Sequence, residues 1–65
     1  MNVYRVGAEP GGGWKVDREG QDRPVARTDT LDAAILYAQE AARSNRPAQI
    51  VIQREDGLVE SHVEL

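Results

Sequence analysis

The chain carries few of the side chains on which catalysis or metal binding is usually built. It has no cysteine and one histidine, His62, which excludes cysteine-ligated metal sites and histidine clusters. No Ser or Cys nucleophile stands in a recognisable pattern with His62, and the nearby Glu55, Asp56 and Glu60 are expected to be solvated. Adjacent carboxylates would need a pocket to shift the pKa of one of them. The sequence therefore predicts no catalytic residue, metal or cofactor, and a protein that is not an enzyme.

Residues 9–13, EPGGG, are a second place where chemistry is conceivable, because glycine-rich loops can cradle phosphate groups. No Gly-Lys-Ser/Thr follows them, and no helix is predicted to begin there. A proline followed by three glycines breaks a strand. We interpret the segment as the turn of a hairpin, with a phosphate site as the less favoured alternative.

Three basic residues, Arg5, Lys15 and Arg27, fall on alternating positions that would share one face of a sheet. Such a face could lie against a phosphate backbone, as the three-stranded sheets of integrase arm-binding domains do; this is an analogy of architecture only. Asp17 would sit on the same face, and the chain has a net charge of −3. An acidic protein lacks the general attraction that dominates non-specific binding to nucleic acids. Nucleic-acid binding is therefore the second hypothesis.

Three apolar or aromatic residues are candidates for an interaction surface. Leu36 falls in the middle of the polar face of a predicted helix, and Tyr37 lies at its flank. A lone exposed leucine is common, so the functional interpretation competes with a neutral one. Trp14 opens a predicted strand, where it either covers the open end of a small core or supplies a partly exposed binding residue.

The pattern along the chain predicts strands, then one helix, then further strands. Period-two alternation and turn residues predict strands at 2–8, 14–18, 23–28, 48–54 and 58–63, with Val25 facing inward, and a turn at Glu55-Asp56-Gly57. Pro24 removes a backbone donor, so the third strand should lie at an edge or carry a bulge. Tyr4 and Val6 share one face, whereas Val3 and Val51 take the other.

The helix is expected over residues 31–44, with Thr30 as N-cap and Asp32 in the first turn. The inward stripe of this helix is rich in alanine and comprises Leu31, Ala34, Ile35, Ala38, Ala41 and Ala42. The order predicts an α+β fold, a mostly antiparallel sheet of four or five strands covered on one face by the amphipathic helix. A right-handed crossover would place the fourth strand parallel to the strand that it joins, which we take to be the first.

The bulk properties limit the class of protein. At 65 residues the chain forms one domain, residues 1–65. It contains no apolar run long enough to span a membrane, no polybasic stretch and no recognisable signal peptide. The sequence therefore predicts a soluble cytoplasmic protein without membrane contact.

Several short motifs together resemble a known bacterial family. They are Tyr4-Arg5-Val6, Gly13-Trp14-Lys15-Val16, Arg18-Glu19-Gly20, Thr30 with Ala34 and Ala38, and Ile50-Val51-Ile52 followed by Asp56-Gly57. The chain is similar, over about residues 3–60, to the family catalogued as domain of unknown function 2188. The resemblance implies a strand-rich layout with one helix and a bacterial or phage source, and it supplies no activity or catalytic residues. Two departures are Ala33, where relatives often complete a capping box with an acid, and Leu36, where they are often polar.

These observations favour a non-enzymatic protein-interaction module. Its partner would be a second copy of the chain, giving a homodimer, or another protein. The reasons are the small core, an available sheet face with Val3 and Val51, and the exposed position of Leu36. The alternative is a weak nucleic-acid-binding domain that uses Arg5, Lys15 and Arg27.

Overall fold

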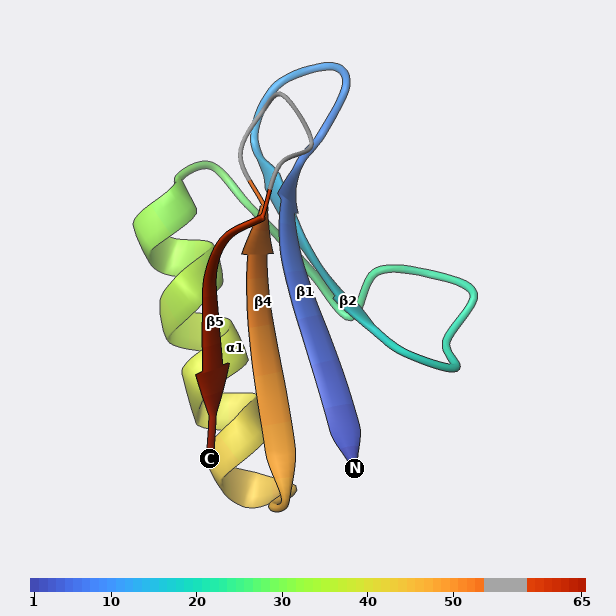
Figure 1. The fold of residues 1–65 in the computed structure, drawn as a ribbon. Helices are drawn as coiled ribbons and strands as arrows, with labels where there is room; N and C mark the ends of the chain where they lie inside the picture. The colour runs from blue at the N-terminus through green and yellow to red at the C-terminus, as the bar shows by residue number, and fades with distance from the viewer. Residues whose placement is uncertain (54–58) are drawn as a thin grey trace.

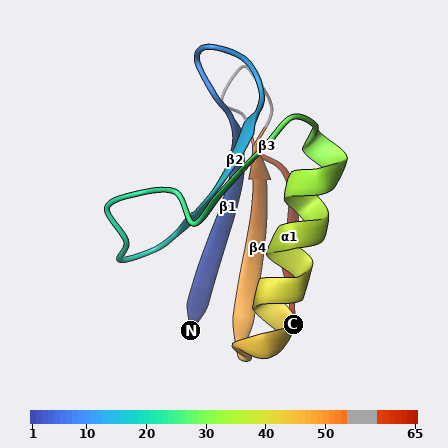
Figure 2. The ribbon, with the colours of Figure 1, turned by 180° about the vertical axis from the view of Figure 1, so that it is seen from behind.

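One helix covers one face of a five-stranded sheet in the computed structural model, which describes residues 1–53 and 59–65 (Figures 1 and 2). The elements are β1 (Asn2–Ala8), β2 (Trp14–Arg18), β3 (Ala26–Thr28), α1 (Leu31–Ser44), β4 (Ala48–Gln53) and β5 (Val59–Glu64). The predicted α+β class, element order and helix bounds are confirmed.

The sheet has the strand order β3-β2-β1-β4-β5. The pairs β1–β2, β2–β3 and β4–β5 are antiparallel, whereas β1 and β4 are parallel. The parallel pair arises because α1 carries the chain back across the sheet before β4 begins, so that β4 runs in the direction of β1. The predicted placement of the fourth strand beside the first is confirmed.

The helix begins and ends where its capping residues require. Thr30 has an extended backbone, and its hydroxyl oxygen accepts a hydrogen bond of 3.1 Å from the N–H of Ala33. Asp32 lies in the first turn and Arg43 in the last, so both charges complement the helix dipole. At the other end the Asn45 side chain donates to the carbonyl of Ala41 at 2.9 Å. None of the helices in the described ranges has the length and apolar character that crossing a membrane demands.

The core is one layer between α1 and the sheet. Its fully covered side chains are Tyr4, Val6, Val16, Ala34, Ala38, Ala42, Ala48, Ile50 and Ile52. All three buried helix residues are alanines, so the helix backbone lies close to the sheet and leaves no space for larger side chains. Leu31, Ile35 and Ala41 flank them and are half-buried, as the helical periodicity predicts.

The third strand differs from the prediction. It comprises three residues rather than 23–28, and the side chain of Val25 is 36% exposed instead of facing inward. Pro24 has no N–H to donate. The N–H of Val25 still donates to the carbonyl of Val16 at 2.8 Å, but the residue in register with Val16 is Ala26. The predicted edge position of this strand is confirmed. The predicted turn at Glu55-Asp56-Gly57 and the start of the last strand at Leu58 lie outside the described residues.

Candidate functional site

The three candidate cations lie on the sheet face that α1 leaves open. Lys15 is the cross-strand partner of Arg27, and Arg5 is the partner of Asp17. All three alternate with core residues, so they point away from the helix. The sequence placed these residues on one face correctly.

Each of the three cations has a carboxylate beside it. Arg27 Nε donates to Glu9 Oε1 at 3.0 Å. Arg5 Nη2 lies 3.5 Å from Glu19 Oε2, and Lys15 Nζ lies 3.6 Å from Asp17 Oδ2. The face is therefore a mixture of both signs of charge, and its field at the distance of a phosphate backbone is small.

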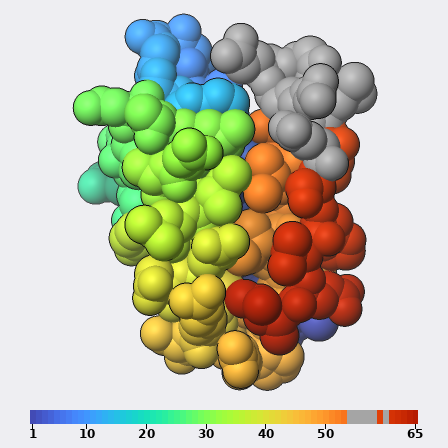
Figure 3. Space-filling model, turned by 90° about the vertical axis from the view of Figure 1, so that its left-hand side faces the viewer, coloured from blue at the N-terminus to red at the C-terminus, as the bar shows by residue number. Residues whose placement is uncertain are grey.

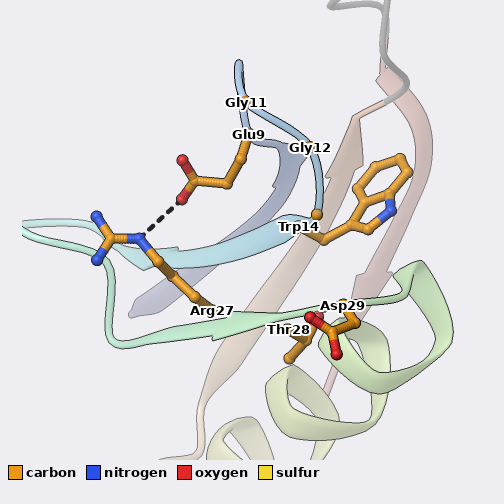
Figure 4. A pocket seen from close by; sticks show the side chains of 8 residues that line it. Glu9, Gly11, Gly12, Trp14, Arg27, Thr28 and Asp29 are labelled. Carbon is orange, nitrogen blue, oxygen red and sulfur yellow. Dashed lines mark hydrogen bonds and ion pairs between the residues drawn. The ribbon is translucent and has the colours of Figure 1, made fainter.

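An open cleft of about 400 Å³ lies where the β1–β2 loop meets the end of β3. Its lining consists of Glu9, Gly11, Gly12, Gly13, Trp14, Arg27, Thr28 and Asp29. In Figure 4 the Glu9–Arg27 ion pair stands on one side of the glycine-rich loop and the indole of Trp14 on the other. The cleft thus contains a paired cation and two carboxylates, a combination that does not favour an anionic ligand.

The glycine-rich loop uses part of its backbone to hold its own shape. The N–H of Glu9 donates to the carbonyl of Gly13 at 3.0 Å, and the N–H of Gly12 donates to the carbonyl of Glu9 at 3.1 Å. These two N–H groups are not free for a phosphate, so the observed hydrogen bonds agree with a hairpin turn. No group of three or more His, Asp or Glu side chains in residues 1–53 and 59–65 could hold a metal ion.

Trp14 lies on the helix side of the sheet, beside Ala8 and opposite Thr28. Its side chain is half-buried and packs against the end of the core. This position matches the expected cover over an open core end, and the ring also forms one wall of the cleft. It is separate from Leu36, because Trp14 lies at the loop end of the sheet and Leu36 on the outside of the helix.

Leu36 and Tyr37 are both exposed on the outside of α1, at 57% and 43%. Tyr37 reaches towards the β3 edge, where its hydroxyl donates to the carbonyl of Val25 at 3.5 Å. We call these three exposed side chains, Val25, Leu36 and Tyr37, the outer-helix surface. The sequence identified Leu36 and Tyr37 but missed Val25, which it placed inside.

A second exposed apolar feature lies at the opposite edge and was not predicted. Val63 pairs with Ile50 and Leu65 with Ala48, so both lie on the helix side of the sheet. Within the described residues the backbone of α1 packs on β1 to β4 and does not approach β5. In Figure 3 side chains of β4 lie between α1 and β5 in the upper part of the view, and the C-terminal residues adjoin the helix lower down. Val63 and Leu65, 42% and 38% exposed, form what we call the β5 ledge.

The sequence profile of one family matches residues 4–62, which is nearly the whole chain. The chain belongs to the DUF2188 family. This family is described as uncharacterised proteins conserved in bacteria, so the bacterial resemblance seen in the sequence is confirmed. No curated protein and no solved structure matched the chain. Membership in DUF2188 thus supplies no activity, and the proposals below rest on the geometry.

Proposed function

We propose that this DUF2188 protein is a non-enzymatic interaction module that binds another protein through its outer-helix surface. The observation that carries the proposal is Leu36, which projects from the middle of the polar face of α1 with 57% of its surface exposed. An exposed leucine alone is ordinary. Leu36 is accompanied by a second exposed side chain, Tyr37, which lies about 100° further round the helix and whose hydroxyl reaches the carbonyl of exposed Val25.

The charges around this surface define the chemistry of the partner. Asp32 and Glu40 lie four residues before and after Leu36, one turn away on the same side of the helix, and both are exposed. Arg43 also lies on this side and pairs with Glu40 at 3.6 Å, so the charge around Leu36 is mixed. The protein as a whole carries a net charge of −3. The fitting partner is therefore a protein with an apolar depression for Leu36 and a polar rim that places a lysine or arginine against Asp32.

Two further features support a binding role over catalysis. The core layer is filled by the alanines of α1, and the cleft at the β1–β2 loop is open, with three glycines among its eight lining residues. A general acid or base needs an environment that shifts its pKa, and a shallow cleft shared by Glu9, Arg27 and Asp29 does little to exclude water. The alternative, nucleic-acid binding through Arg5, Lys15 and Arg27, is weakened by the three ion pairs.

The proposal is tested by a photo-crosslinking side chain placed at position 36 in the bacterial host. The matched control carries the same side chain at Glu19, which is also exposed but lies in the β2–β3 turn. The expected result is one protein captured from position 36 and not from position 19. After purification, that protein should bind the Leu36→Glu variant at least tenfold more weakly than wild type, a loss of about 1.4 kcal/mol or more.

Two results would contradict the proposal. One is capture of the same proteins from both positions. The other is unchanged affinity of the Leu36→Glu and Tyr37→Ala variants for the captured protein. A folded Leu36→Glu variant is expected, because a side chain this exposed contributes little to the core.

A further inference from the structure

Strand β5 lies at one edge of the sheet. Its pairing with β4 determines which of its N–H and carbonyl groups point outwards, away from β4. The N–H and carbonyl of Leu65 both bond to Ala48, at 2.8 and 3.2 Å. In an antiparallel ladder such pairs alternate, so residues 61, 63 and 65 bond to β4. The N–H and carbonyl groups of His62 and Glu64 therefore point outwards from the sheet.

The two edges of the sheet are not equally protected. At the other edge β3 has three residues and follows Pro24, and both features oppose pairing with another chain. β5 has six residues, and its irregular pairing with β4 is confined to the region of Ile52 and Gln53. Residues 61–65 thus offer a regular edge, with the partly exposed β5 ledge beside it.

We propose that two copies of the chain associate by antiparallel pairing of β5 with β5, with the two-fold axis at Val63. This proposal goes beyond the outer-helix interaction in two ways. The surface lies at the opposite edge of the molecule, and the binding partner is a second copy of the chain. A two-fold axis perpendicular to the sheet relates two β5 strands that pair antiparallel. It makes one sheet of ten strands from two of five.

Hydrogen-bond complementarity of side chains selects the register. With the axis at Val63, His62 of each copy lies directly opposite Glu64 of the other, twice in the dimer, on the open face of the sheet. The same pairs exchange the outward N–H and carbonyl groups of both residues. Moving the axis to His62 would instead place two imidazoles against each other. Across a strand pair the imidazole N–H of His62 can donate to the carboxylate of Glu64, and such complementary cross-strand pairs stabilise a sheet.

The same register covers the β5 ledge. Val63 meets Val63 of the second copy across the axis as a pair without mutual hydrogen bonds, the closer kind of cross-strand neighbour. Leu65 lies opposite Ser61 of the second copy, so that both ledges adjoin in one apolar strip on the helix side. Burial of this strip adds a hydrophobic contribution to the backbone pairing. The outer-helix surfaces of both copies stay exposed, on the same side of the joined sheet.

The test uses the fact that the protein has no cysteine of its own. Val63→Cys should form a disulfide-linked dimer with oxidised glutathione as the oxidant, because Cα atoms of such a pair are about 4.5 Å apart and disulfides need about 4.4–6.8 Å. His62→Cys and Leu36→Cys are the matched controls. Both positions are exposed, but neither should meet its own copy across the axis, so their dimers should form at least tenfold more slowly.

Sedimentation of the unmodified protein, from about 1 µM to 1 mM, supplies a second measurement. The expected result is a concentration-dependent dimer that Val63→Arg abolishes while its circular dichroism stays that of wild type. A protein that remains monomeric throughout this range would overturn the proposal. So would a dimer that cross-links fastest through His62→Cys or Leu36→Cys, since either result requires a different register or surface. These readouts do not involve the partner captured at Leu36, so each proposal can fail without the other.

Discussion

Gly13 lies directly against the carbonyl oxygen of Thr28, which would be 2.9 Å from a Cβ atom at position 13. Its φ of +81° is also in the region that glycine adopts without strain. The end of the β1–β2 loop therefore lies against the end of β3, and both residues line the cleft. Gly13→Ala should therefore lower the free energy of unfolding by about 2–4 kcal/mol, through the backbone conformation and the contact together.

Two other glycines separate these causes. Gly20 has a φ of +93° but open space around it, so Gly20→Ala should cost only the conformational part, about 1–2 kcal/mol. Gly11 has neither a positive φ nor a neighbour within 4 Å, and Gly11→Ala should be neutral or stabilise by less than about 1 kcal/mol. Urea unfolding monitored by circular dichroism measures the change in the free energy of unfolding for each of the three variants. Equal losses at positions 13 and 20 would show that the Thr28 contact contributes nothing.

The fold could be predicted because local and long-range signals agreed. The alternation in residues 2–8 and 14–18, the N-cap at Thr30 and the alanine stripe each fixed an element, and the handedness of the crossover placed β4 beside β1. The third strand was overestimated because Val25 is β-prone in isolation. The strand ends at Thr28 as predicted but begins only at Ala26, because Pro24 cannot donate to the sheet, and propensity does not report this.

The alanine stripe makes a second prediction. Ala38 is fully buried between α1 and the sheet, so Ala38→Leu adds three carbon atoms where no space exists. Overpacking of this kind costs about 1–3 kcal/mol, and here the helix must move away from Tyr4 and Ile50 to accommodate it. Ala33→Leu is the control, because Ala33 is exposed on the same helix and should change stability by less than about 0.5 kcal/mol. A tolerated Ala38→Leu would show that the helix packs loosely.

The candidate sites were less predictable than the fold. Alternation could place Arg5, Lys15 and Arg27 on one face, but the partner of Arg27 is Glu9, eighteen residues away and supplied by the glycine-rich loop. The β5 ledge could not be inferred from the sequence. Val63 would be an ordinary core residue if a second helix covered that end of the sheet. Which strands a single helix leaves uncovered is decided by the tertiary arrangement.

The open sheet face makes a third prediction, on nucleic acids. Because Arg5, Lys15 and Arg27 are each paired with a carboxylate, the wild-type protein should show no binding to duplex DNA at about 0.15 M salt. The combined replacement of Glu9, Asp17 and Glu19 by their amides raises the net charge from −3 to zero and leaves the three cations unpaired.

That triple variant should gain weak binding that disappears as salt is added, which a fluorescence-anisotropy titration can follow. The control is the same triple variant with Lys15→Gln added, whose affinity and salt dependence should both fall. Salt-dependent binding by the wild-type protein, reduced by Arg5→Gln, would instead support the nucleic-acid hypothesis.

The two proposed interfaces would reinforce each other if both exist. A β5-paired dimer presents two outer-helix surfaces on one side of its joined sheet, and a partner with two binding regions could engage both. The second contact would then be intramolecular and its affinity correspondingly higher. Val63→Arg should in that case weaken the binding of a bivalent partner without touching Leu36 or Tyr37, and leave a monovalent fragment of that partner unaffected.

Asn2 gives a last prediction, because it joins three elements at the end of the sheet opposite the cleft. Its Nδ2 donates to the carbonyl of Asn45 at 2.6 Å, and its Oδ1 accepts from Arg18 Nη2 at 2.7 Å. Both bonds are partly buried, and the one to a charged donor is the stronger kind. Asn2→Ala should lower the free energy of unfolding by about 1–3 kcal/mol. A double-mutant cycle with Arg18→Ala should give a coupling of about 1–2 kcal/mol. A coupling near zero would mean that Arg18 stabilises the fold through its position over the Tyr4 ring, 5.7 Å from the centroid, rather than through Asn2.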